Sequence, residues 1–252
     1  MDLIQQFPQA ASYTISGTDQ AVLMLHGFTS TPNSFRPLAH HLSTHFGWEI
    51  HVPLLPGHGQ TYDKLNITTF EQWIDACEKE FLKLKEKFSK VHLVGLSMGG
   101  TLCAHLSTKY PETIGSLILL SPALYLRDFW SRFFLPLVKF LPKSVLCRWI
   151  FEKEITDALE QISYHRYSAF AVVELNSLCK MVQKEFYTTK PCLIFSPIHD
   201  LTIHPKSSTW FLEHSSNPKS KIVELEQSPH VVFLGKENEK IFSETENFLK
   251  LL

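Results

Sequence analysis

The chain has 252 residues, of which 44% are hydrophobic and 19% are charged. This apolar content is close to the about 45–50% of globular domains, so a disordered or collagen-like chain is excluded. With 24 Lys and Arg against 25 Asp and Glu, the net charge is -1, and no nucleic-acid partner is expected because nothing attracts the whole chain to phosphate.

Cysteine usage and the first residues bear on where the protein works. Five cysteines occur without a CxxC pair, which favours a reducing, cytoplasmic environment, and we expect all five to be buried thiols: Cys77, Cys103, Cys147, Cys179 and Cys192. The start, MDLIQQFPQAAS, has neither a basic segment nor a continuous apolar stretch, so no signal peptide is expected. No uninterrupted apolar run reaches the about 18 residues of a membrane-spanning helix.

Short apolar runs alternate along the chain with longer segments of helical period. In chain order, strands are predicted at residues 21–25 (AVLML), 48–52 (WEIHV), 91–95 (VHLVG), 116–120 (SLILL), 192–196 (CLIFS) and 221–225 (KIVEL). This alternation predicts an α/β fold, in which helices cover both faces of a doubly wound, mostly parallel sheet.

Helices are predicted between the strands and after the last one. The first is entered through Pro37 and is followed by Gly47, and the second has Thr68 and Glu71 at the spacing of a capping box. The predicted helices cover residues 34–46, 68–88, 98–110 and 237–252.

The alternation breaks between the fourth and fifth predicted strands. About 70 residues of aromatic-rich, helical sequence lie there, far more than an ordinary connection needs. We therefore predict a helical cap over residues 122–190, inserted into a core domain formed by residues 1–121 and 191–252.

The segment Gly95-Leu96-Ser97-Met98-Gly99 matches the pattern G-x-S-x-G between a predicted strand and a predicted helix. A serine on so tight a turn needs small residues two positions away on either side, and its hydroxyl then projects above the sheet. Ser97 is the predicted nucleophile; a purely structural turn is the alternative.

A serine hydroxyl needs a base, and thirteen histidines compete for that role. With this motif the acid and then the histidine follow the serine in the chain, which leaves His199, His204, His214 and His230 after the insertion. His199 and His204 flank the best acid candidate too closely to reach over it. His214 ends a predicted helix, whereas His230 follows the strand 221–225 at the carboxyl edge of the sheet, so we predict His230 as the base.

The acid and the oxyanion hole are expected in loops at the same edge. Asp200 is the carboxylate of the loop after strand 192–196, with helix capping as its alternative role. Two backbone N–H groups near the nucleophile would bind an oxyanion: that of Met98, which follows Ser97, and that of Phe28 in the loop after strand 21–25.

These motifs together resemble a known family. HGFTS follows the first predicted strand, PGHG occupies residues 56–59, GLSMGG surrounds Ser97, and QSPHVV surrounds His230. The chain resembles the α/β-hydrolase superfamily, and within it the small bacterial carboxylesterases and monoacylglycerol lipase-like enzymes. The resemblance runs from about residue 21 to the end, the insertion excepted, and implies a triad of Ser97, Asp200 and His230 with Phe28 and Met98 as oxyanion donors.

The implied activity is hydrolysis of carboxylic esters of apolar acyl chains through an acyl-enzyme, with a small ester or lipid as substrate and without a cofactor. Thioester hydrolysis or acyl transfer on the same residues is an alternative, as is a non-catalytic module that binds a ligand or partner. The sequence leaves the acyl length and the oligomeric state open. No metal site is expected: His41 and His45 share a helix face, but neither an acidic partner of the HExxH kind nor a third ligand is evident.

The aromatic residues of the insertion admit three interpretations. They pack the cap helices together, or they line an acyl pocket, or with neighbouring Arg and Lys they form a patch that contacts a membrane surface. The candidates for the acyl pocket are Phe129, Trp130, Phe133, Phe134 and Phe140.

Overall fold

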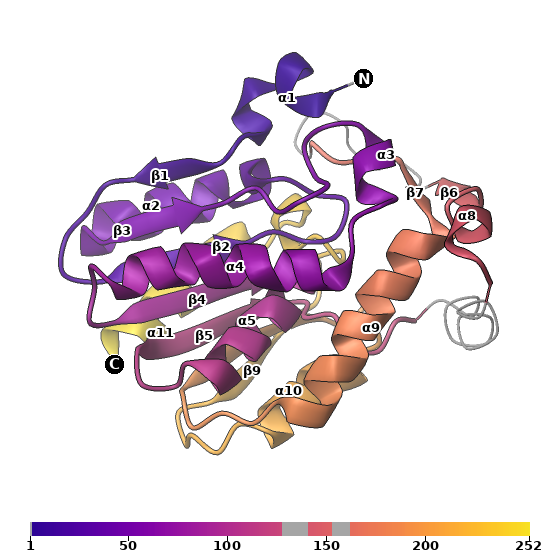
Figure 1. The fold of residues 1–252 in the computed structure, drawn as a ribbon. Coiled ribbons are helices and arrows are strands. Elements are labelled where there is room, and N and C mark those ends of the chain that lie inside the picture. Colours follow the sequence, from indigo (N-terminus) through magenta and orange to yellow (C-terminus); the bar gives the residue numbers. More distant parts are fainter. Residues whose placement is uncertain (1, 128–140, 153–161) are drawn as a thin grey trace.

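The computed structural model describes residues 2–127, 141–152 and 162–252 (Figure 1). Its central sheet has the strand order β1-β3-β2-β4-β5-β8-β9, in which β1 is antiparallel to β3 and every other pair is parallel. The strands are β1 (Tyr13–Ile15), β2 (Ala21–Leu25), β3 (Glu49–Val52), β4 (Val91–Leu96), β5 (Ile114–Leu120), β8 (Cys192–Pro197) and β9 (Lys221–Leu225). The predicted fold class is confirmed, and β1 is the strand of this sheet that the sequence analysis missed.

Alternate residues of the central strands point into two separate hydrophobic layers. In β2, Ala21, Leu23 and Leu25 pack in one layer, whereas Val22 and Met24 pack in the other. All five side chains are fully buried. Both faces of a parallel sheet are covered, so its strands need apolar side chains at successive positions. This explains why β2 is a continuous apolar run.

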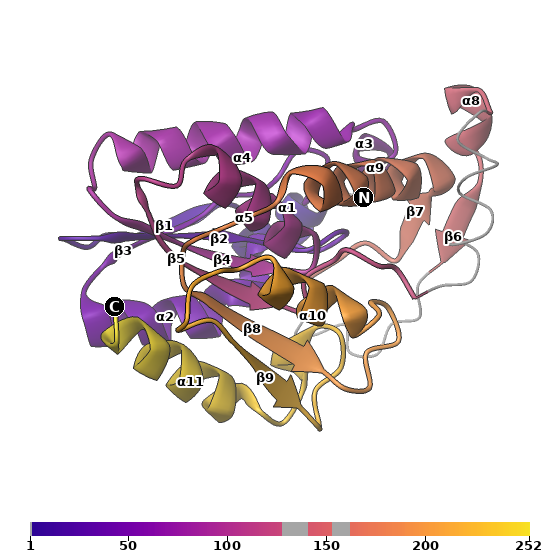
Figure 2. The same cartoon turned by 90° about the horizontal axis from the view of Figure 1, so that it is seen from below.

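Helices cover both faces of the sheet (Figure 2). One face carries α2 (Arg36–Phe46) and α11 (Asn238–Lys250), and the other carries α4 (Phe70–Lys85), α5 (Met98–Lys109) and α9 (Ala169–Glu185). The helix α10 (Lys206–Glu213) packs Phe211 into the same layer as α5. Short elements complete the described chain: α1 (Leu3–Gln6), η1 (Pro8–Ala10), η2 (Pro32–Phe35), α3 (Tyr62–Leu65), α8 (Lys143–Leu146) and η3 (Val232–Leu234).

The start of α4 differs by one residue from the prediction. Its capping box consists of Thr69 and Gln72, whose Oε1 accepts from the Thr69 N–H at 2.9 Å, and not of Thr68 and Glu71. The Thr68 hydroxyl instead donates to the carbonyl of Lys64 at 2.7 Å. Either of the two adjacent threonines could serve as the N-cap. Because the Thr68 hydroxyl is hydrogen-bonded to the preceding turn, Thr69 takes this position.

The described part of the predicted cap is not helical throughout. Two antiparallel strands, β6 (Ile150–Glu152) and β7 (Arg166–Ser168), form a small second sheet that the prediction of a helical cap did not include. The helix α9 then returns along the core, where its buried face joins the layer of α4 and α5 (Figure 1). The predicted aromatic residues at 129–140 lie outside the described residues.

Two smaller expectations concern cysteines and membrane spans. Four cysteines are buried, as expected, but Cys147, which caps the C-terminus of α8 and donates its thiol hydrogen to the carbonyl of Asn66, is only half-buried. None of the helices in the described ranges is long and apolar enough to cross a bilayer.

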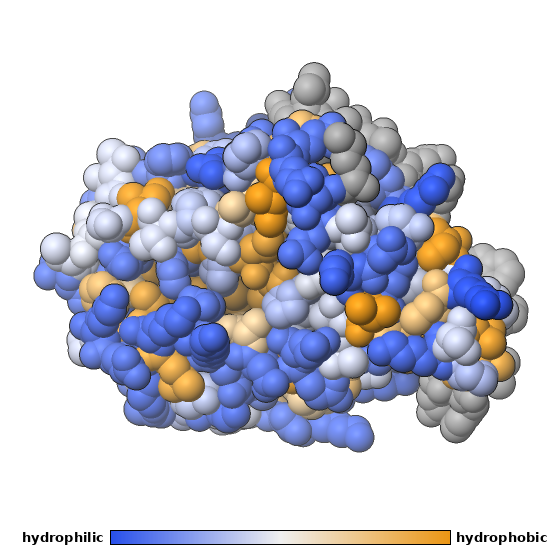
Figure 3. Space-filling model, turned by 45° about the horizontal axis from the view of Figure 1, so that its top comes forward, coloured by the Kyte–Doolittle hydropathy of each residue, from blue (hydrophilic) through white to orange (hydrophobic). Residues whose placement is uncertain are grey.

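At the end of the molecule that carries α8 and β6, apolar side chains lie exposed among polar ones (Figure 3), among them Trp149, Ile150 and Phe151.

Candidate active site

Ser97 occupies a strained turn between β4 and α5. Its φ of 53° lies in the left-handed region, which is unfavourable for a residue with a side chain and recurs at functional sites. The neighbouring backbones leave no room for side chains: a Cβ on Gly99 would lie 1.8 Å from the Leu25 carbonyl oxygen, and one on Gly95 would lie 2.4 Å from the Gly100 nitrogen. The G-x-S-x-G spacing is therefore a steric requirement of this turn.

The side chains of Ser97, His230 and Asp200 form one chain of hydrogen bonds. The Ser97 Oγ lies 3.0 Å from the His230 Nε2, and the His230 Nδ1 lies 2.7 Å from the Asp200 Oδ2. The other carboxylate oxygen of Asp200 accepts from the N–H groups of Thr202 and Ile203 at 2.7 and 2.8 Å. With one oxygen held by the backbone, the carboxylate of Asp200 has a fixed orientation toward the imidazole.

The loop of Asp200 is paired with the first residues of the insertion. The N–H of Arg127 donates to the Thr202 carbonyl at 2.9 Å, and the N–H of His204 donates to the Tyr125 carbonyl at 2.8 Å. The Arg127 guanidinium also donates to the carbonyl of Asp200 itself. Sequence reasoning missed Arg127, because no local pattern indicates a contact between residues 73 apart.

The loop of His230 is held by one carboxylate. Glu237 accepts from the N–H groups of Glu226 and Gln227 at 3.2 and 2.8 Å and from the Ser228 hydroxyl at 2.8 Å. Burial opposes ionisation of Glu237, but these hydrogen bonds, that of Gln227 foremost, hold its pKa below the usual range. An ionised Glu237 thus fixes the residues just before His230.

His214, the rejected base candidate, lies elsewhere. Its Nδ1–H donates to the Trp210 carbonyl at 2.8 Å, and its ring stacks on Trp210 with the centroids 3.8 Å apart. It follows the end of α10 and precedes β9, so it lies at the amino edge of the sheet, opposite to Ser97. His199 and His204 are exposed in the loop of Asp200.

The two predicted oxyanion donors lie next to Ser97. Met98 begins α5, so its N–H has no intrahelical acceptor. Phe28 follows Gly27, whose added Cβ would lie only 3.4 Å from the Ser97 Cβ. Within the described ranges, neither of these N–H groups donates to a protein acceptor.

Two buried histidines tie the loop of Phe28 to the PGHG loop. The Nε2 of His26 accepts from the Leu55 N–H at 3.0 Å, and the Nε2 of His58 accepts from the Thr29 N–H at 3.2 Å. The His58 Nδ1–H donates to the Pro56 carbonyl. Burial holds the pKa of His26 well below its usual range and lowers that of His58 to about 4, so both rings are neutral near pH 7.

A mostly apolar pocket of about 290 Å³ opens above Ser97 and His230. Its walls come from the loop after β2, from the segment after β5, from the small second sheet, from α9 and from the loop of Asp200: Phe28, Thr29, Leu126, Phe151, Tyr167, Val172, Leu175, Leu201, Thr202 and Ile203. Sequence reasoning missed the wall residues of α9, although Val172 and Leu175 have the i, i+3 spacing of one helix face. The predicted acyl-pocket residues at 129–140 stay a prediction.

Comparisons with known proteins agree with this geometry. A family model described as the alpha/beta hydrolase fold matches residues 20–145, half of the chain. The chain belongs to the α/β-hydrolase family. This α/β-hydrolase is 29% identical to a thermostable monoacylglycerol lipase of Bacillus sp. (strain H-257) over 90% of the chain and 89% of that protein. It is 24% identical to a carboxylesterase of Bacillus subtilis (strain 168), over 95% and 96% of the two chains.

Solved structures show the same fold over nearly the whole length. One from a study of two metagenome-derived lipolytic enzymes, LipS and LipT, superposes with a TM-score of 0.84 at 23% identity, covering 97% of this α/β-hydrolase and 99% of the other chain. The monoacylglycerol lipase of Paleococcus ferrophilus superposes with a TM-score of 0.76 at 19% identity, covering 94% and 98%. The sheet and its flanking helices are thus those of the shared fold.

Proposed function

We propose that this protein is a serine hydrolase that cleaves carboxylic esters of apolar acyl chains, with Ser97, His230 and Asp200 as its triad. The observation that carries the proposal is the hydrogen-bonded series from Asp200 through His230 to Ser97 at the floor of an apolar pocket. A non-catalytic binding module would not need three reactive side chains aligned in this way. The relatives named monoacylglycerol lipase and carboxylesterase support the same class of substrate.

The proposed reaction begins with attack of the Ser97 Oγ on the ester carbonyl carbon. The His230 Nε2 takes the serine proton, and Asp200 stabilises the resulting imidazolium through the hydrogen bond to Nδ1. The carbonyl oxygen becomes an oxyanion, for which the N–H groups of Phe28 and Met98 are the donors. The alcohol leaves with the proton from His230, and the acyl group stays on Ser97.

Deacylation repeats these steps with water. His230 takes a proton from the water molecule, whose oxygen attacks the acyl carbon, and then returns the proton to the Ser97 Oγ as the carboxylic acid leaves. Thioester hydrolysis uses the same steps with a thiol as leaving group. Acyl transfer replaces water by a second alcohol.

The size of the pocket favours a substrate with one acyl chain. Its volume of about 290 Å³ lies at the lower end of the range of about 300–1,000 Å³ for small-molecule sites. Monoacylglycerols and simple alkyl esters therefore fit the proposal better than triacylglycerols. We also propose residues 122–190 as the cap, since Phe151, Tyr167 and two residues of α9 in this segment form the side of the pocket that faces away from the sheet.

Hydrolysis of p-nitrophenyl esters tests the proposal. Ser97→Ala and His230→Ala should each lower kcat by several orders of magnitude, because triad members act as a unit. His214→Ala, a histidine outside the series, is the matched control and should keep wild-type turnover. Unchanged turnover in Ser97→Ala, with unfolding midpoints equal to the wild type, would refute the proposed mechanism.

A further inference from the structure

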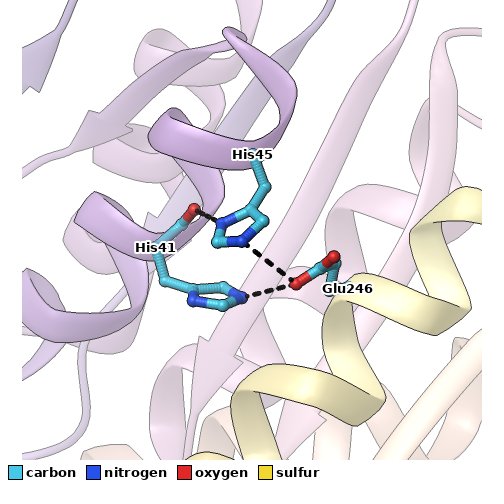
Figure 4. Close-up of side chains that lie close together, drawn as sticks. All are labelled: His41, His45 and Glu246. Atoms are coloured by element: carbon cyan, nitrogen blue, oxygen red, sulfur yellow. Dashed lines mark hydrogen bonds and ion pairs between the residues drawn. The ribbon is translucent and has the colours of Figure 1, made fainter.

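Three potential metal ligands meet between the helices α2 and α11 (Figure 4). His41 and His45 are one helical turn apart on α2, and both point at Glu246 on α11. The Glu246 Oε2 lies 3.0 Å from the His41 Nε2 and 3.6 Å from the His45 Nε2. The third ligand, which the sequence analysis did not find, comes from a helix 205 residues further along the chain.

The hydrogen bond of His45 decides which of its nitrogens faces Glu246. The Nδ1 lies 2.8 Å from the His41 carbonyl oxygen, which can only accept, so Nδ1 carries the proton. In the neutral ring, Nε2 then has a lone pair that faces a carboxylate oxygen. A cation between these two acceptors, either a proton or a metal ion, makes their contact favourable.

The distances favour a metal ion. Zn²⁺ binds imidazole nitrogen and carboxylate oxygen at about 2.0–2.2 Å, so two ligands of a tetrahedral ion are about 3.4 Å apart. The two separations, 3.0 and 3.6 Å, bracket this value. The longer separation, 3.6 Å between the His45 Nε2 and the Glu246 Oε2, exceeds the usual N–H···O hydrogen-bond distance of about 2.7–3.2 Å. Moreover, ligating histidines commonly donate their other N–H to a backbone carbonyl, as His45 does.

The surroundings of the cluster keep its ligands in place. Lys250 donates to Oε1 of Glu246, the oxygen that does not face the histidines. The ring of His41 stacks on Phe242 with the centroids 5.2 Å apart. The side chains of His41, His45 and Glu246 are 22%, 41% and 15% exposed, so an ion can enter from solvent.

The cluster is remote from the proposed active site. His45 lies at the end of α2, just before β3 begins, and therefore at the amino edge of the parallel sheet. Ser97 and His230 follow the carboxyl ends of β4 and β9, at the opposite edge. A metal ion at this position has no access to the proposed reaction, so its role would be structural.

We propose that His41, His45 and Glu246 bind a divalent transition-metal ion, Zn²⁺ in the first instance, which fastens the last helix, α11, to α2. The ion takes the two Nε2 atoms and Oε2, and water completes the fourth position. His45 keeps its proton on Nδ1, and His41 carries its proton on Nδ1 as well, so any further proton on the rings is released to solvent. Imidazole and carboxylate together are a ligand set that suits zinc and its neighbours in the series.

Isothermal titration of the untagged, EDTA-treated protein with ZnCl2 tests the proposal. We expect one site per chain and a higher unfolding midpoint when Zn²⁺ is present. His45→Ala and Glu246→Gln should each lower the affinity at least about tenfold and abolish the rise in midpoint. His40→Ala is the matched control, since His40 is on the same helix but outside the cluster, and it should bind like the wild type.

Two readouts separate this proposal from failure of the fold or of the proposed function. Glu246→Gln keeps the shape of the side chain, and circular dichroism of the metal-free variants checks that they fold. Ester hydrolysis should be unchanged in His45→Ala and Glu246→Gln, because neither residue belongs to the triad. Absence of zinc binding by the wild type, or equal binding by the wild type and both cluster variants, would overturn the proposal.

Discussion

Replacing His58 by glutamine should make the protein less sensitive to mild acid. The ring of His58 is 1% exposed, and its Nε2 must be unprotonated to accept from the Thr29 N–H. Burial lowers its pKa to about 4, against about 6.5 in an unfolded chain. Glutamine keeps an acceptor for Thr29 but does not titrate, and it loses the donor to Pro56.

The sign and size of the effect follow from these two pKa values. Between pH 6.5 and pH 4 the unfolded chain binds a proton at His58 that the folded chain does not, so the free energy of unfolding falls as the pH falls. From pH 7 to pH 5, the loss from this one residue is about 2 kcal/mol. His92 is also buried with a lowered pKa and adds the same dependence to both proteins, whereas the pKa of His26 is lowered by burial first and then by His58.

Urea unfolding at pH 7 and pH 5, followed by fluorescence, measures the difference. The wild type should lose about 2 kcal/mol more than His58→Gln between the two pH values, although the variant starts from a lower stability at pH 7. His199→Gln, a change at an exposed histidine, is the control and should keep the wild-type loss. An equal loss in the wild type and His58→Gln would show that His58 is not held neutral by burial, which would refute the reasoning.

Three further changes test the site and its turn. Asp200→Asn should lower kcat for p-nitrophenyl esters by up to about 10⁴-fold, since it removes the charge that supports the imidazolium; a loss below about tenfold would contradict the assignment of the acid. Leu175→Ala enlarges the pocket and should shift the preference toward longer acyl chains. The ratio of kcat/KM between long and short esters should change by a factor that corresponds to about 1–3 kcal/mol, and an unchanged ratio would show that Leu175 does not contact the acyl chain. Gly99→Ala should lower the free energy of unfolding in urea by at least about 3 kcal/mol, because the added Cβ would overlap the Leu25 carbonyl. Gly47→Ala, which meets open space at a φ of 64°, should cost only about 1 kcal/mol; equal losses would contradict the steric argument.

The sheet and the turn of Ser97 follow from local features of the sequence. The strands β2, β4, β5 and β8 are mostly apolar runs, as expected for strands that are buried on both faces of a parallel sheet. The turn of Ser97 depends on Gly95 and Gly99, both within two residues of it. Because parallel strands end at one edge, the loops of Asp200 and His230 were expected beside this turn, and their side chains lie within hydrogen-bonding distance in series with Ser97.

The distant residues that complete each site could not be predicted from the sequence, because they are brought together by the fold. β1 has two half-buried residues and one exposed residue and is defined by its pairing with β3, and the equally short strands β6 and β7 pair with each other. Two residues of the pocket wall lie on α9, and the partner of His41 lies on α11. The periodicity of each helix predicts that one of its faces is buried, but not which residues that face contacts. A local pattern reports how a segment partitions between core and solvent. Contacts between two segments depend instead on how the elements that contain them are arranged in the fold. A short stretch of sequence does not specify this arrangement.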